Sequence, residues 1–253
     1  MLLIMVVNSA SASMALVRRG TALRLRGGGR GGEPEKTGKV WTLNTFTRDH
    51  VRFAWELPSY LGSYVGPNML DPKTIELVML TVNSINTCPF CTGLHGELAR
   101  MAKVAVDSKL PATEFAKAFA ENSGRGPQVQ NAFSTLKDQL GVGKAKNVRA
   151  LCWALTWGKT TGNTIKLSKE KLLSLRWTSL TPADIVVLLL YGPLFVVIAV
   201  LNAALTIFPT VPPWFSAIFG VCLWVPQALH IAPIGLASLV VRLLLAPFAG
   251  LSL

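Results

Sequence analysis

The residues best suited to chemistry lie in one short stretch, 88–95, with the sequence CPFCTGLH. Residues three or four apart share one face of a helix, so Cys88, Cys91 and His95 should line up. Free backbone N–H groups and the dipole at the start of a helix favour a thiolate, which is the nucleophilic form of cysteine. His95 can accept the thiol proton because its ordinary pKa is near neutral. Once one cysteine is oxidised to a sulfenic acid, the other can close a disulfide.

Glu76 lies upstream in the otherwise apolar run 75–80, which has the sequence IELVML. A carboxylate in such a run should be partly desolvated, which raises its pKa and suits it to a proton relay. The alternative is an exposed carboxylate paired with Lys73, three residues earlier. The residues alone leave both interpretations open.

Together, Glu76, Cys88, Cys91 and His95 resemble the active-site pattern of the alkylhydroperoxidase D-like family, in the carboxymuconolactone decarboxylase-like superfamily. Eleven residues separate the glutamate from the first cysteine, two separate the cysteines, and three separate the second cysteine from the histidine. The resemblance is best over 71–106 and extends over most of 40–160. It implies an all-α domain that forms a homo-oligomer, typically a trimer or hexamer.

The resemblance also implies a role for each of the four residues. Cys91 would be the peroxidatic cysteine, Cys88 would resolve it as a redox-active Cys88–Cys91 disulfide, and His95 and Glu76 would relay protons. The implied activity is alkylhydroperoxide reduction with an unidentified thiol reductant, and it needs no organic cofactor and no metal. Some members carry a further histidine between the cysteines, where this chain has Phe90. The decarboxylase branch lacks the cysteine pair, so lactone decarboxylation is not expected.

Three other interpretations remain open at this stage. A zinc site would need a fourth ligand beside the pair and His95, and the candidates His50 and Cys152 lack ligand-like spacing. A membrane-tethered interaction or assembly module would keep the cysteines as a vestige or a regulatory switch, although a structural disulfide needs neither His95 nor Glu76. A protein dithiol oxidoreductase normally places its cysteines in a βαβ unit, which this sequence does not predict.

Several other conspicuous residues are expected to be structural. His50 follows two charged residues and is predicted at the surface, while Cys152 and Cys222 are predicted to be inert packing residues. An upstream group of aromatic residues is predicted to pack in the core rather than to wall a substrate pocket. This group is Trp41, Phe46, Phe53, Trp55 and Tyr60.

Helix signals dominate residues 33–180, which show no strand-like alternation. Asp71 followed by Pro72 supplies a cap and a first-turn proline for one helix. Further helices are expected over 87–106, 112–122, 128–140 and 144–157. We therefore predict an all-α fold, in which an alkylhydroperoxidase D-like bundle precedes two or three transmembrane helices.

The charged residues are unevenly distributed along a chain of net charge +12 and mean hydropathy +0.43. Residues 1–32 hold five arginines and no acidic residue, which fits an organelle leader that ends in a Gly-rich linker. It resembles the two-part leaders of algal plastid proteins, with a mitochondrial leader as the alternative. A nucleic-acid binder should gather its basic residues on one face of a folded domain, so we expect no nucleic-acid partner.

Residues 181–253 contain only two charged residues, Asp184 and Arg242, and have the composition of a membrane region. The uncharged run 185–208 is long enough to cross a hydrocarbon core of about 30 Å. Prolines interrupt the second run, 214–241, which forms one kinked span or two short ones. Basic residues just before the first span place the helical domain, 33–180, on the stromal or matrix side. A membrane anchor suggests lipid hydroperoxides as substrates.

Overall fold

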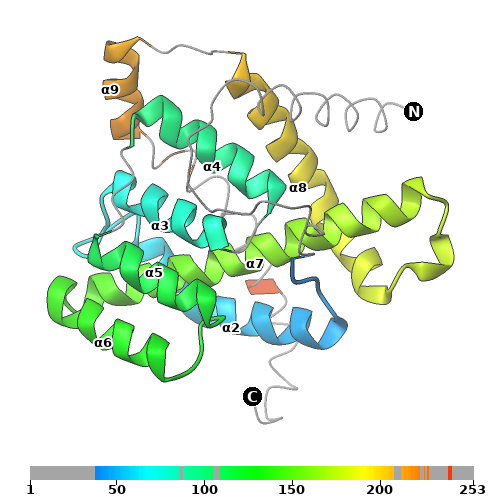
Figure 1. Ribbon diagram of the computed structural model, residues 1–253, viewed down its shortest axis with the longest axis horizontal. Coiled ribbons are helices and arrows are strands. Elements are labelled where there is room, and N and C mark those ends of the chain that lie inside the picture. The colour runs from blue at the N-terminus through cyan, green and yellow to red at the C-terminus, as the bar shows by residue number, and fades with distance from the viewer. Residues whose placement is uncertain are drawn as a thin grey trace, which may run out of the picture.

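The computed structural model describes residues 38–85, 88–104, 109–207 and 212–222, together with 225, 227, 239 and 240. All regular structure among these residues is helical, which confirms the predicted fold class (Figure 1). The helices are α2 (Leu43–Gly62), α3 (Pro72–Ile85), α4 (Pro89–Ala102), α5 (Pro111–Glu121), α6 (Pro127–Leu140), α7 (Val142–Leu173), the short 3-10 helix η1 (Trp177–Ser179), α8 (Pro182–Thr206) and α9 (Pro213–Cys222). The predicted leader and most of the second predicted span lie outside the described residues.

Two helix starts that the sequence predicts have the expected caps. At α3, the backbone N–H of Thr74 donates to the Asp71 carboxylate at 3.0 Å. At α8, the Asp184 backbone N–H donates to the Thr181 hydroxyl at 3.2 Å, and the Thr181 backbone N–H donates to the Asp184 carboxylate at 2.8 Å. Each cap satisfies backbone donors that a helix leaves unpaired at its start.

α7 runs through the middle of the molecule and contacts α2 to α6 as well as α8 (Figure 1). The prediction that this helix ends at Trp157 is wrong, because α7 continues to Leu173. The extension is rich in Gly, Thr and Asn, which have low helix propensity. Its hydroxyl groups are satisfied within the helix, since Thr161 and Thr164 donate to carbonyls four residues earlier at 3.0 and 2.7 Å. The small side chains let other elements pack closely against α7.

The predicted aromatic core is confirmed with one exception. Trp41, Phe46, Phe53 and Tyr60 are buried, whereas Trp55 is 66% exposed. Trp55 lies on the outer face of α2.

α8 packs on α4 and α7 with one face and exposes the other. The buried side chains recur at helical spacing: Ala183, Val187, Tyr191, Phe195 and Ile198. The exposed face carries Ile185, Leu189, Leu190, Val197 and Val200. Within the described residues, one helix is long and apolar enough, by length and composition, to cross a membrane. Its candidate span is Pro182–Val200, which has a mean hydropathy of 2.5, and 33% of its most apolar stretch is buried. The predicted boundary between the helical domain, 33–180, and the membrane region, 181–253, stays a prediction.

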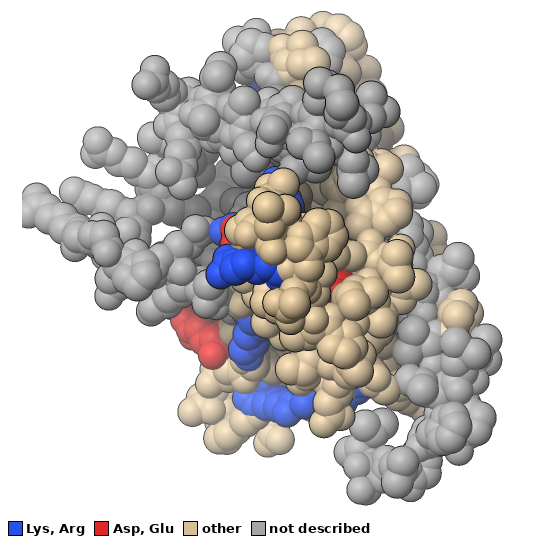
Figure 2. All heavy atoms as spheres, turned by 90° about the vertical axis from the view of Figure 1, so that its right-hand side faces the viewer, with Lys and Arg blue, Asp and Glu red and all other residues tan. Residues whose placement is uncertain are grey.

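The end of α7 brings basic side chains next to this apolar helix. Figure 2 shows the side of the molecule on which α7 ends, where several Lys and Arg side chains lie beside a broad, mostly uncharged area.

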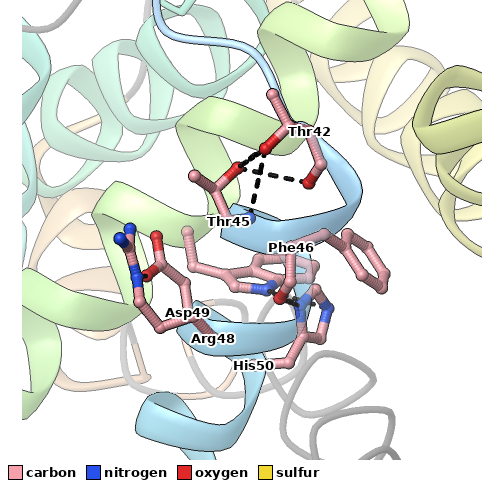
Figure 3. A network of polar contacts seen from close by, with 7 residues as sticks. Thr42, Thr45, Phe46, Arg48, Asp49 and His50 are labelled. Carbon is pink, nitrogen blue, oxygen red and sulfur yellow. Dashed lines mark hydrogen bonds and ion pairs between the residues drawn. The ribbon is translucent and has the colours of Figure 1, made fainter. Parts of the chain in front are cut away.

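His50 is fully buried, so its predicted surface position is wrong. Figure 3 shows its ring beside Phe46, whereas the charged neighbours Arg48 and Asp49 pair with each other on another side of α2. Nδ1 of His50 lies 2.6 Å from the Phe46 carbonyl oxygen and Nε2 lies 2.8 Å from the Tyr191 hydroxyl. The Trp157 indole N–H also points at Nε2, at 3.0 Å. A neutral His50 therefore joins α2, α7 and α8.

We expect His50 to make the fold sensitive to acid. Burial lowers the pKa of His50 from 6.5 to about 4, against the opposing effect of the Phe46 carbonyl. The unfolded chain binds a proton below about pH 6.5, whereas the folded chain does so only below about pH 4, so stability falls as the pH falls through this window. The loss should reach about 2 kcal/mol at pH 5.

Urea unfolding of the wild type and of His50→Gln at pH 7 and pH 5 measures this contribution. The variant cannot titrate at this position, so its free energy of unfolding should fall by about 2 kcal/mol less than that of the wild type. Equal falls in the two proteins would refute the assignment.

Candidate functional site

The two cysteines open α4, as the sequence predicts. Cys88 is the N-cap residue, Pro89 occupies the first helical position, and Cys91 lies in the first turn. Their sulfur atoms lie 2.8 Å apart, and the Cys91 backbone N–H donates to Cys88 Sγ at 3.4 Å. Both thiols are free and buried. The sulfurs are thus placed to share one proton and, after oxidation, to form a disulfide with little movement.

The local environment places negative charge on Cys88 rather than on Cys91. Burial alone raises the pKa of the Cys88 thiol, but the Cys91 thiol, the Cys91 backbone N–H and the charge of Lys159 outweigh it and lower this pKa. The hydrogen bond to Cys88, and then burial, raise the pKa of the Cys91 thiol. In the reduced pair Cys88 is therefore the thiol that ionises more readily, and Cys91 holds the shared proton.

Glu76 and His95 form a buried pair beside the cysteines. Both side chains are fully buried, and His95 Nδ1 lies 2.8 Å from Glu76 Oε1. Glu76 is therefore not an exposed partner of Lys73. Because the carboxylate accepts at Nδ1, Nε2 is the ring nitrogen that can accept a proton. His95 lies one turn after Cys91 on α4, with a Cβ separation of about 6 Å.

Lys159 of α7 is a further charged residue at the site. Its side chain is 2% exposed, and its Nζ donates to the carbonyl oxygen of Val82 in α3. Burial lowers the pKa of Lys159 to about 7, and the charges of Cys91 and Cys88 oppose this shift. A buried ammonium group close to two thiols is a ready source of positive charge and of a proton.

Helices α7 and α8 form a tight wall next to Cys88. A Cβ atom built on Gly162 would lie 2.7 Å from Cys88 Sγ and 3.0 Å from the Phe195 ring, so a side chain has no room there. The Phe195 ring packs edge-on against Phe90, with centroids 5.4 Å apart. The cysteine pair is thus enclosed by apolar groups on this side.

One residue of the C-terminal region also reaches the site. Gln227 Nε2 donates to Glu76 Oε2 at 2.7 Å and to the Pro72 carbonyl at 3.1 Å. The two oxygens of Glu76 are therefore held by His95 on one side and by Gln227 on the other. This contact fixes the carboxylate that orients His95.

The other candidate residues lie elsewhere. Cys152 is fully buried, and burial raises the pKa of its thiol, as expected of an inert packing residue. Cys222 is exposed, so its predicted packing role is wrong. Among the described residues, no group of three or more His, Cys, Asp and Glu side chains is arranged to hold a metal ion.

The sequence analysis missed the part of the site that comes from α7, α8 and Gln227. One signal was present for Lys159, which is the only charged residue between Arg149 and Lys166. A lone charge in a long helical run of small and apolar residues indicates a buried, functional or paired group. Gly162, Phe195 and Gln227 carried no comparable signal.

Comparison with known proteins gives one family match. Residues 53–120 match the sequence profile of the Carboxymuconolactone decarboxylase family. This segment runs from α2 to α5 and includes the glutamate, both cysteines and the histidine. No curated protein and no solved structure gives a significant match to the chain.

Proposed function

We propose that this protein is a membrane-anchored thiol peroxidase that reduces organic hydroperoxides with the Cys88–Cys91 dithiol. The observation that carries the proposal is the sulfur–sulfur distance of 2.8 Å at the start of α4, beside the buried His95–Glu76 pair. The match to a family with alkylhydroperoxidase members supports it. Catalysis would use a nucleophilic sulfur, a proton relay and a second sulfur, and the proposal assigns these roles to Cys91, to the His95–Glu76 pair and to Cys88.

In the first half-reaction Cys91 attacks the hydroperoxide. His95 accepts the Cys91 proton at Nε2 while Glu76 stabilises the positive charge that forms on the ring. The Cys91 thiolate attacks the terminal oxygen, the O–O bond breaks, and Cys91 becomes a sulfenic acid. His95 returns its proton to the departing alkoxide, which leaves as an alcohol.

In the second half-reaction Cys88 resolves the sulfenic acid. The Cys88 thiolate attacks the Cys91 sulfur, the S–O bond breaks, and the hydroxide takes a proton from Lys159 and leaves as water. The positive charge of Lys159 is one of the causes that lower the pKa of Cys88, and it favours the thiolate at this step. An external thiol then reduces the Cys88–Cys91 disulfide.

The surroundings of the pair favour a substrate with an apolar body. Phe90 and Phe195 flank Cys88, and Phe195 comes from the helix whose other face is apolar and exposed. A lipid hydroperoxide would bring its acyl chain along such a surface, because apolar contact supplies affinity there. Water-soluble peroxides lack this contribution.

Steady-state turnover of the full-length protein in neutral detergent tests the proposal, with dithiothreitol as reductant. The protein should reduce a phospholipid hydroperoxide faster than hydrogen peroxide. Cys91→Ser and Cys88→Ser should each lose about 100-fold in rate, because the two sulfurs act as one unit. Cys152→Ser, a buried thiol outside the site, is the matched control and should keep wild-type activity.

The result that would contradict the proposal is turnover that survives in Cys91→Ser. A rate in the wild type no higher than that of dithiothreitol alone would instead favour an interaction module with a regulatory cysteine pair.

A further inference from the structure

A second cleft, of about 360 Å³, lies between α2, α5, α6 and α7 and shares no lining residue with the cysteine site. α5 and α6 lie side by side against α7 in Figure 1. Aromatic rings wall the cleft: Phe115, Phe119, Phe133 and Trp153. Three arginines also line it: Arg52, Arg125 and Arg149. Mostly apolar walls with a few convergent polar groups are typical of a small-molecule site.

Two of the guanidinium groups are held against the aromatic walls. Arg52 Cζ lies 4.0 Å from the centre of the Trp153 ring, and Arg149 Cζ lies 4.9 Å from the centre of the Phe133 ring. Stacking fixes the plane of a guanidinium group and leaves its N–H edges available to an acceptor. The basic groups are thus positioned before a ligand arrives.

Positive charge exceeds negative charge in this cleft. Arg149 pairs with Glu56 at 3.1 Å, and Asp49, the other carboxylate acting on Arg52, already pairs with its neighbouring arginine at 2.8 Å. Burial, and then the charge of Arg125, lower the pKa of Arg52. Holding like charges together is unfavourable, and an anion in the cleft would offset this cost.

Two unsatisfied donor groups point to the same kind of ligand. Arg149 Nε is buried and has no hydrogen-bond partner among the described residues. α6 begins at the cleft, and its N-cap residue is Gly126, which has no side chain to cap the first turn. The positive end of a helix and an unpaired guanidinium N–H both favour a negatively charged oxygen.

We propose that this cleft binds a small organic anion, whose acid group contacts Arg52, Arg125 and Arg149 and whose apolar body lies against the aromatic walls. The volume is at the low end of the roughly 300–1,000 Å³ of ligand pockets, which suits a single ring or a short chain. The site is distinct from the cysteine pair, since Trp153 and Lys159 are separated by about 9 Å along α7.

Ligand-observed ¹⁹F NMR on the full-length protein in neutral detergent tests this site with two matched probes. 4-Fluorobenzoate carries the acid group, and 4-fluorobenzamide has the same shape without the charge. We expect saturable binding of the benzoate with a Kd of about 1 mM or tighter, the range open to a ligand of this size. The amide should bind at least about tenfold more weakly, because charged hydrogen bonds to arginine are lost.

Arg149→Met should weaken benzoate binding at least about tenfold, because it removes a charge and an unpaired donor. Arg176→Met removes an exposed arginine outside the cleft and should leave binding unchanged. Circular dichroism shows whether each variant is folded. If Arg149→Met does not fold, Arg125→Met supplies a second test of the same cleft.

Three results would overturn the proposal. They are equal binding of the benzoate and the amide, complete displacement of the benzoate by inorganic phosphate at equal concentration, and the absence of saturable binding at millimolar benzoate. Peroxidase activity does not enter this test, so its outcome is independent of the proposed reaction.

Discussion

Lys159→Met should raise the pKa of the Cys88 thiol, because it removes a positive charge that helps the hydrogen bonds from Cys91 to stabilise the thiolate. Peroxide turnover at pH 7 should fall at least about tenfold, because Lys159 favours the Cys88 thiolate that resolves the sulfenic acid and supplies the proton for the departing hydroxide. The thiolate absorbance at 240 nm, followed against pH, measures the pKa directly. The measurement uses a Cys222→Ser background, so that the exposed Cys222 thiol adds nothing to the absorbance.

Two variants separate charge from packing at this position. Lys159→Arg keeps the charge and should recover part of the thiolate, whereas Lys166→Met removes a lysine two turns further along α7 and should leave the thiol pKa unchanged. If Lys159→Met lowers the unfolding temperature but leaves the pKa of the thiol pair unchanged, Lys159 has only a structural role. Its proposed part in catalysis is then wrong.

Gly162→Ala should block the resolving step. The new Cβ would lie 2.7 Å from Cys88 Sγ and 3.0 Å from the Phe195 ring, so the sulfur must move. Overpacking of this kind typically costs about 1–3 kcal/mol of stability. With Cys88 displaced, Cys91 should still react with hydroperoxide but should remain as the sulfenic acid, which dimedone traps.

Gly158→Ala is the matched control one turn earlier on α7. A Cβ at Gly158 meets nothing within 4 Å, so the variant should turn over normally and gain up to about 1 kcal/mol of stability from helix propensity. Dimedone labelling of Gly162→Ala no higher than that of Gly158→Ala would contradict the placement of Cys88 against α7.

Local signals predicted the first half of the site. Pro89 at the first helical position and the cysteine spacing place both sulfurs in one turn, and the i+4 spacing places His95 on the same face. Glu76 interrupts an apolar run, which left a buried carboxylate and an exposed pair with Lys73 both open, and the structure has the buried one. These relations depend on neighbours in the chain, which a single sequence displays.

Long-range contacts formed the rest of the site and were not predictable in this way. Lys159 and Phe195 lie far from Cys88 in the chain, and only the packing of α7 and α8 brings them together. His50 shows the same limitation, because two charged neighbours suggested a surface residue while partners on α7 and α8 buried it. The end of α7 was missed because burial against other helices, α8 among them, outweighs the poor helix propensity of its residues.

The packing of α8 bears on how the protein would sit in a membrane. One face of α8 completes the wall beside Cys88, so this helix contributes to the site as well as exposing an apolar face. Removing 181–253 would therefore disturb the bundle itself, and point variants of the full chain are the cleaner tests.

The central claim is tested most directly by a single turnover with reduced full-length protein and one equivalent of tert-butyl hydroperoxide. Peptide mapping should show the loss of two of the four thiols, a Cys88–Cys91 disulfide and one equivalent of tert-butanol, with no disulfide in Cys91→Ser. Retention of all four thiols, or oxidation no faster than that of free cysteine, would contradict the proposed peroxidase.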